Sequence, residues 1–252
     1  MVRQRIFDAH ARLGPTPAAR DRLLSTLDEC GIERAVVVAG GVIDLDRLAR
    51  QLAEGGGVTG DADNDAALAA QEATGGRLVP FFFANPHADP AAYADRAADF
   101  RGVEISPAVH GVALSDPRTV ELVSVAASAG HPVYTVCLYR PGDTVADLVA
   151  LARKFPEATF ILGHLGVDLI DTYAIDLVSE VDNIMVETSG GYTVLLRIAV
   201  ERLGADRLLF GSESPHQHPS VELAKFAALD LPPADWARIA WGNADRLFGG
   251  TR

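Results

Sequence analysis

The chain has 252 residues, of which 48% are hydrophobic, so it is long enough to bury a sizeable core. Its formal net charge of −12 argues against nucleic acid and anionic membranes as partners, because both carry negative charge. Its two cysteines, Cys30 and Cys137, make no disulfide framework, which favours a reducing cytoplasm. We expect no signal peptide, and no apolar run reaches the roughly 18 residues of a membrane span.

Eight short apolar runs alternate with longer segments of helical pattern from one end of the chain to the other. The runs are rich in Val, Ile and Phe without strict alternation, as in strands that are buried on both faces of a parallel sheet. We therefore predict strands at residues 6–9, 35–40, 78–84, 102–106, 132–137, 159–163, 184–188 and 207–211.

Capping residues and prolines mark where helices begin between these strands. Thr16 and Pro17 pair a cap with a proline at the first helical position, and Gly31 closes that helix. Four more helices are predicted to begin near residues 60, 89, 116 and 142, and the last ones to occupy 219–228 and 233–248. The glycine-rich segment 54–61 is expected to be a surface connector, with a mobile lid as the alternative.

Eight strand–helix units in a chain of this length predict a (β/α)₈ TIM barrel of the α/β class. We expect a single domain over residues 1–252, with the final helix packing as an extra element. An open doubly wound sheet is the alternative fold, although it normally uses fewer strands.

Polar residues follow most of the predicted strands, at the end where a parallel barrel places its active site. A purely structural barrel would have little use for so many polar groups there. They are Asp8, His10 and Arg12 on the first strand, Glu104 and Ser106 on the fourth, His164 after the sixth, Glu187 and Ser189 on the seventh, and Glu213, His216 and His218 after the eighth.

These segments resemble motifs of the amidohydrolase superfamily, in particular its amidohydrolase-related branch of decarboxylases, lactonases and hydratases. The segment FDAHARLG (7–14) is similar to the metal motif of the first strand, and GNADRLFG (242–249) to the closing helix. The third, fourth, sixth and eighth strands are matched by RLVPFFFANP, GVEISP, FILGHLG and LLFGSESP. The resemblance spans nearly the whole chain and implies a barrel enzyme acting on a small molecule.

The resemblance also implies metal ligands, and the chain departs from them. The family places two histidines on the first strand, one at the end of the fifth and an aspartate on the eighth. His10 matches the first of these, whereas Arg12, Val136 and Glu213 stand at the other three. Arginine cannot ligate a metal, so we expect no cofactor. A single divalent metal such as zinc, held by His10, His164 and Glu213, is the alternative.

The expected roles follow from this departure. Arg12 would stand in for the cation, since its planar fork can pair with Glu213 and hold a substrate oxygen. Glu213 would be the general base, with burial raising its pKa, and His10 would help Arg12 to polarise the carbonyl. His164 matches a family histidine that is usually catalytic, and would position substrate or pass a proton to the leaving group.

The remaining site residues have less specific expected roles. Asp8 would orient the first turn and support the site residues without contacting the substrate. Glu104 would either contact substrate or form a buried ion pair with Arg12. Further substrate contacts are expected from Tyr139, Arg140, Glu187 and His216.

The favoured function is hydrolysis of a small lactone or amide, bearing a carboxylate, without metal. The first alternative is a lyase on the same scaffold, a decarboxylase or dehydratase with or without metal. The second is a pseudoenzyme that binds a small ligand. The sequence leaves open whether copies of the chain associate as a homo-oligomer.

Overall fold

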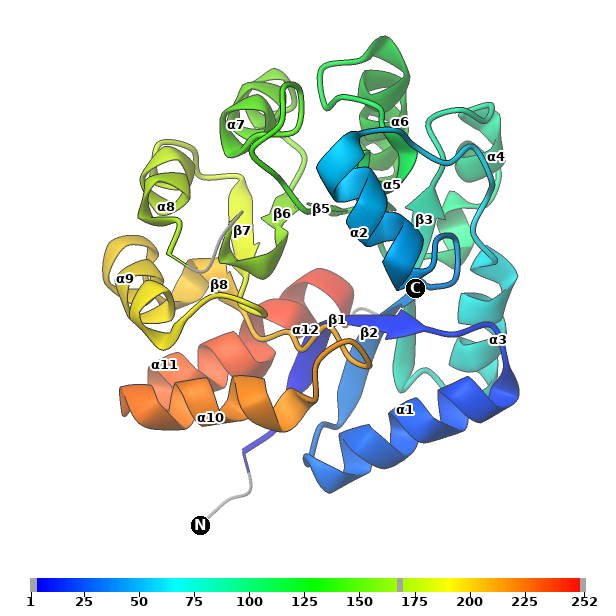
Figure 1. Ribbon diagram of the computed structural model, residues 1–252. Helices are drawn as coiled ribbons and strands as arrows, with labels where there is room; N and C mark the ends of the chain where they lie inside the picture. The colour runs from blue at the N-terminus through cyan, green and yellow to red at the C-terminus, as the bar shows by residue number, and fades with distance from the viewer. Residues whose placement is uncertain (1–3, 167–169, 250–252) are drawn as a thin grey trace.

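The computed structural model describes residues 4–166 and 170–249, and its strands form one parallel sheet (Figure 1). Each strand pairs with the next in chain order. The strands are β1 (Phe7–Leu13), β2 (Arg34–Ala39), β3 (Leu78–Ala84), β4 (Val103–Ile105), β5 (Val133–Thr135), β6 (Phe160–Leu162), β7 (Ile184–Glu187) and β8 (Leu208–Leu209).

Backbone hydrogen bonds join β1 to the segment that follows β8 and so close the sheet. The Ala9 amide donates to the Phe210 carbonyl at 2.8 Å, and the Arg12 amide donates to the Ser214 carbonyl at 2.7 Å. This closure confirms the predicted (β/α)₈ barrel and excludes the alternative fold, an open doubly wound sheet. Figure 1 shows helices arranged around the strands.

Eight helices in the described part of the chain pack around the barrel. They are α1 (Pro17–Glu29), α3 (Asn64–Ala73), α4 (Ala91–Ala94), α6 (Pro117–Ala129), α7 (Val145–Lys154), α8 (Thr172–Ser179), α9 (Thr193–Leu203) and α10 (Pro219–Leu229). All except α4 and α9 begin at a side-chain cap. Two of them start later than predicted, because Asp63 and Thr144, rather than the preceding Gly-Asp pairs, accept from the free backbone N–H groups of α3 and α7.

The C-terminal segment is more broken than the single predicted helix over 233–248. It consists of α11 (Pro233–Ala237), a π-helical turn (Arg238–Gly242) and α12 (Asn243–Phe248). Ile239 and Ala240 of the turn are fully buried, and the Ile239 carbonyl accepts from the Phe210 amide at 3.1 Å. Packing against the barrel bottom therefore sets the local geometry of this segment.

One helix that the sequence analysis does not assign, α2 (Leu45–Glu54), lies beside the short α5 (Pro107–His110). The side-chain nitrogen of Gln51 donates to the carbonyls of Ala108 and Val109 at 2.5 and 2.9 Å. These bonds hold α2 across one side of the barrel mouth, so the helix, rather than the segment 54–61, lies nearest to the opening. Within the described residues, no helix is long and apolar enough to cross a membrane.

Candidate active site

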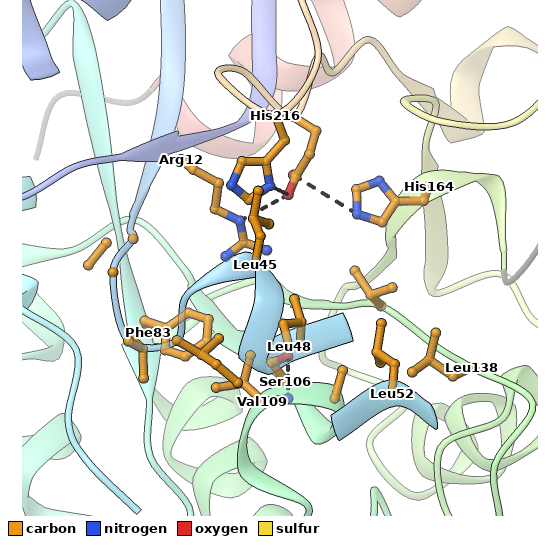
Figure 2. Close-up of a pocket in the computed structure, with 18 residues that line it drawn as sticks. Arg12, Leu45, Leu48, Leu52, Phe83, Ser106, Val109, Leu138, His164 and His216 are labelled. Carbon is orange, nitrogen blue, oxygen red and sulfur yellow. Dashed lines mark hydrogen bonds and ion pairs between the residues drawn. The ribbon is translucent and has the colours of Figure 1, made fainter. Parts of the chain in front are cut away.

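A cavity of about 200 Å³ opens at the carboxyl ends of the strands, between the barrel and α2 (Figure 2). Its polar lining residues are Arg12, Ser106, His164, Glu213 and His216. Figure 2 shows Arg12, His164 and His216 gathered at one end, and Leu45, Leu48 and Leu52 of α2 along another side. The sequence analysis places all five of these polar residues at strand ends, and the barrel brings them to one pocket.

The Arg12 guanidinium lies between two carboxylates at the bottom of this pocket. Its Nη1 and Nη2 lie 2.9 and 2.8 Å from the two oxygens of Glu104, and its Nε donates to Glu213 Oε1 at 3.1 Å. The two terminal nitrogens carry four N–H groups, so the bidentate pairing with Glu104 leaves two for a ligand. Arg12 therefore bridges the carboxylates and still presents donors to the cavity.

His10 lies below Arg12, fully buried and outside the pocket lining. Its ring stacks on Tyr134 with centroids 4.0 Å apart. Nε2 is 3.1 Å from Glu104 Oε2, and Nδ1 is 2.5 Å from Glu213 Oε2, although at an angle that does not suit a hydrogen bond. The ring thus touches both carboxylates. The structure does not bring it to a position from which it could polarise a substrate carbonyl.

The charges of this cluster set its protonation. Burial alone would lower the pKa of His10, but Glu213 and Glu104 outweigh it and raise the pKa to about 9. Burial alone would raise the pKa of Glu213, but Arg12, His10 and His164 together hold it well below its usual range. For Glu104, Arg12 and His10 likewise outweigh burial and lower the pKa. The expectation that burial raises the pKa of Glu213 is therefore wrong: this carboxylate stays ionised and is a weak base.

His164 follows β6 and is held by a chain of hydrogen bonds from β7. The Ser189 hydroxyl donates to Glu187 Oε2 at 2.9 Å, so its oxygen accepts from His164 Nδ1 at 2.7 Å. Glu187 Oε2 also accepts from the His164 amide at 3.2 Å and from the Tyr134 hydroxyl at 3.1 Å. This arrangement assigns the neutral ring a proton on Nδ1 and a lone pair on Nε2, which lies 4.0 Å from Glu213 Oε2.

Two of the central residues have an unusual backbone. His164 and Glu213 have φ angles of 60° and 57°, in the left-handed region that residues other than glycine rarely adopt. Such conformations persist where the surrounding structure imposes them, and they cluster at functional sites. Here the strain turns both side chains toward the same end of the pocket.

Asp8 lies behind the cluster, fully buried at the junction of β1 and β8. It accepts from the backbone amides of His10 at 3.1 Å and Ser212 at 3.0 Å, and from the Ser212 hydroxyl. Burial outweighs these bonds and raises the pKa of Asp8 to about 7. Its bonds join the two strands that carry Arg12 and Glu213.

Of the five residues considered as substrate contacts, one lines the pocket and four do not. His216 lines the pocket, with Nδ1 3.6 Å from Glu213 Oε1. Glu104 and Glu187 are buried beneath it and point to Arg12 and Ser189 instead. Tyr139 is 69% exposed on the β5–α7 loop, and Arg140 donates to the Gln51 carbonyl of α2 at 2.9 Å; neither is among the residues that line the pocket.

Several pocket residues were not expected from the sequence. They are the apolar ones, above all Phe83 on β3 and the three leucines of α2. Leu45, Leu48 and Leu52 have helical spacing after the cap residue Asp44, and that pattern was the available signal. Tyr134, which supports both His10 and Glu187, carried no signal, because it lies in the middle of a predicted buried strand.

The donor set of this site does not fit a divalent metal. Both oxygens of Glu104 and Oε1 of Glu213 face the guanidinium of Arg12. His10 Nδ1, Glu104 Oε1 and Glu213 Oε2 have no hydrogen-bond partner among the described residues, but Glu104 Oε1 lies 2.8 Å from Arg12 Nη2. That leaves two donor atoms, which face one another, whereas a zinc site takes at least three protein ligands. Across residues 4–166 and 170–249, no group of three or more His, Cys, Asp or Glu side chains is arranged to hold a metal.

The raised pKa of His10 predicts a dependence of stability on pH. The native ring holds its proton up to about pH 9, whereas the unfolded ring loses it near 6.5. Its contribution is therefore complete below pH 6.5 and is lost as the pH rises through 9, by up to about 3 kcal/mol. Denaturant unfolding between pH 6 and 10 should show this decline. The variant His10→Gln, although less stable at pH 6, should have a flatter profile; an equal slope would place the titration elsewhere.

The chain belongs to the amidohydrolase family, whose family model, described as amidohydrolase, matches residues 12–250. A gamma-resorcylate decarboxylase from Polaromonas sp. is 31% identical over 120 residues, a match that covers 39% of this chain and 36% of that protein. The matched stretch is thus little more than a third of that relative's length.

Similar solved structures include both decarboxylases and a proposed hydrolase. A 5-carboxyvanillate decarboxylase from Sphingomonas paucimobilis superposes with a TM-score of 0.71 at 17% identity, over 100% of both chains. That from Novosphingobium aromaticivorans, complexed with manganese and 4-hydroxy-3-methoxy-5-nitrobenzoic acid, gives 0.74 at 17%, over 98% of this chain and 97% of that one. A proposed 2-pyrone-4,6-dicarboxylic acid hydrolase from Pseudomonas putida gives 0.73 at 19%, over 97% of each. At these identities the likeness establishes the fold.

Proposed function

We propose that this amidohydrolase-family enzyme hydrolyses a small carbonyl compound, a lactone or an amide, without a metal ion. The observation that carries the proposal is the Arg12 guanidinium, which occupies the space between Glu104 and Glu213, lines the pocket and has two N–H groups that these carboxylates do not use. A cation in that place supplies the electrostatic stabilisation that a metal supplies in other members of the family.

The donors of Arg12 would bind the carbonyl oxygen and stabilise the negative charge that develops on it when water attacks. The Glu213 carboxylate and His164 Nε2 are 4.0 Å apart and both accept hydrogen bonds, so one water can donate to each. Since Glu213 is a weak base, we now assign it to orienting that water.

His164 is then the general base. Its Nε2 takes the proton of the attacking water and delivers it to the leaving oxygen or nitrogen, and Ser189 and Glu187 stabilise the protonated ring. His10 holds Glu104 and Glu213 in place and balances their charge. Carbonyl C–O or C–N cleavage gives a carboxylic acid and an alcohol or amine.

Decarboxylation is the second candidate, favoured by the gamma-resorcylate and 5-carboxyvanillate decarboxylases that the chain resembles, one of which contains manganese. A pseudoenzyme that binds ligand without turnover is the third. The three make different predictions for metal content and for products.

The test is turnover of a panel of lactones, amides and aromatic acids by purified protein, before and after treatment with a chelator. We expect well under one equivalent of bound metal, hydrolysis of at least one lactone or amide, and no loss after chelation. Near-stoichiometric metal together with chelator-sensitive release of CO₂ would replace the proposal by a metal-dependent lyase. Ligand binding with no product from any compound would replace it by the pseudoenzyme.

A further inference from the structure

We infer that the substrate is an uncharged carbonyl compound with an apolar body, rather than a carboxylate. This inference rests on the proposed function and names the class of substrate for the same site. It departs from the dianionic and aromatic acids for which the similar structures are named, and from the carboxylate expected from the sequence.

The first argument is the balance of charge around the carbonyl position. Arg12 and His10 face two carboxylates, Glu104 and Glu213, at contact distance, so the cluster has no excess positive charge even when the His10 ring is protonated. A substrate carboxylate bound to the free N–H groups of Arg12 would lie beside Glu213 with no excess positive charge to offset the repulsion. An uncharged carbonyl oxygen uses the same donors without that cost.

The second argument is that the pocket offers no second cation. Among the described residues that line it, Arg12 is the only lysine or arginine. The Arg140 guanidinium is the nearest alternative on the β5–α7 loop, but it donates to the Gln51 carbonyl and does not line the cavity. Among the described lining residues, His164 and His216 are the other side chains with basic nitrogens, and neither is a permanent cation.

The third argument is the composition of the walls. Thirteen of the eighteen lining residues are apolar or glycine, and Figure 2 shows Phe83, Val109, Leu52 and Leu138 away from Arg12, His164 and His216. Phe83, Val109, Val136 and Leu138 come from the barrel side and its loops. A polar or charged substituent would lose its contacts with water against such a wall, whereas an apolar substituent that covers the wall contributes favourable binding free energy.

The fourth argument is the exposed apolar face of α2. Leu45, Leu48 and Leu52 line the pocket from the same face of the helix, and Leu45 and Leu52 are 60% and 39% exposed. The Gln51 and Arg140 hydrogen bonds hold this face over the cavity. An apolar substrate body lying under α2 would cover the exposed parts of these side chains.

The test uses three small probes at pH 8: hexanamide, hexanoate and acetamide. Hexanamide and hexanoate have the same apolar body and differ in charge, whereas acetamide keeps the head and lacks the body. Calorimetric titration should give hexanamide the highest affinity, at least about tenfold above hexanoate and at least about tenfold above acetamide. If hexanoate binds as tightly as hexanamide, the inference that the substrate is uncharged is overturned. If acetamide binds as tightly as hexanamide, the inference that the substrate has an apolar body is overturned.

Two variants make the test specific. Glu213→Gln removes the carboxylate charge that would repel a carboxylate bound to Arg12, so hexanoate should bind at least about tenfold more tightly than to the parent. Leu52→Asp should weaken the binding of hexanamide. The matched control Val221→Asp, at an exposed apolar residue of α10 outside the pocket, should leave that binding unchanged. A Glu213→Gln variant that still discriminates against hexanoate, or equal loss in both aspartate variants, would overturn the inference.

These are binding measurements, so they separate the two proposals. Failure to hydrolyse any lactone or amide would overturn the proposed function even if hexanamide binds as expected. The reverse result, hydrolysis with a preference for anionic substrates, would overturn the substrate class alone.

Discussion

Replacement of His164 by asparagine is expected to lower kcat/KM for hydrolysis about a thousandfold while the fold is kept. The imidazole Nε2 that we assign as general base is lost, whereas asparagine tolerates the backbone φ of 60° and can still bond to Ser189. The measurement is kcat/KM on the best lactone or amide of the panel, with a thermal melt beside it. A rate within a few-fold of the parent would remove His164 from the chemistry.

Ser189→Ala is the matched variant, because it keeps the ring and removes the group that fixes its orientation. Ser189 is the only side chain hydrogen-bonded to His164 Nδ1 among the described residues. We expect a smaller loss, about tenfold, and a change in the pH dependence of kcat/KM, which a purely structural defect would not produce. The same relative loss at every pH would mean that Ser189 supports the fold and not the base.

The architecture could be predicted from the sequence because barrel strands are buried on both faces. Runs such as 35–39 and 78–84 are apolar throughout, and that pattern does not depend on distant residues. The placement of the polar residues followed from the same logic, since every parallel strand ends at the same face. Helix starts were less certain, because Gly-Asp pairs and true caps look alike in sequence, and only hydrogen bonding from Asp63 and Thr144 separates them.

The site was predicted less completely, since its properties depend on distances between strands. The sequence could suggest a pairing of Arg12 with Glu213 or with Glu104, but not that the guanidinium binds both carboxylates at once. Glu104 also contacts His10, and the His10 ring therefore lies in the buried cluster and not in the pocket. The pKa of Glu213 falls for the same reason, since two cations at contact distance outweigh its burial.

The other large effect is expected from the double replacement Arg12→His with Val136→His, which should create a zinc site. Arg12 and Val136 line the same pocket, and the two imidazoles would join His10 and Glu213 as up to four ligands. Removing the guanidinium also frees the oxygens of Glu213. The variant should hold about one equivalent of zinc, and zinc at a hundred times its dissociation constant should raise Tm by about 5 to 10 °C. Hydrolysis by the native route should be lost, because the donors to the carbonyl oxygen are gone.

The matched control is Arg12→Gln with Val136→Gln, which makes the same two positions polar and uncharged without adding zinc ligands. Zinc titrated against the parent, each single histidine variant, the double histidine variant and this control should bind in the order of ligand number. The parent and the glutamine control should not respond to zinc. If the double histidine variant binds no better than the control, the ends of β1 and β5 do not converge on one point. The replacement of a metal by Arg12 would then lose its geometric basis, since the site would be unable to hold a metal even with the family's ligands restored.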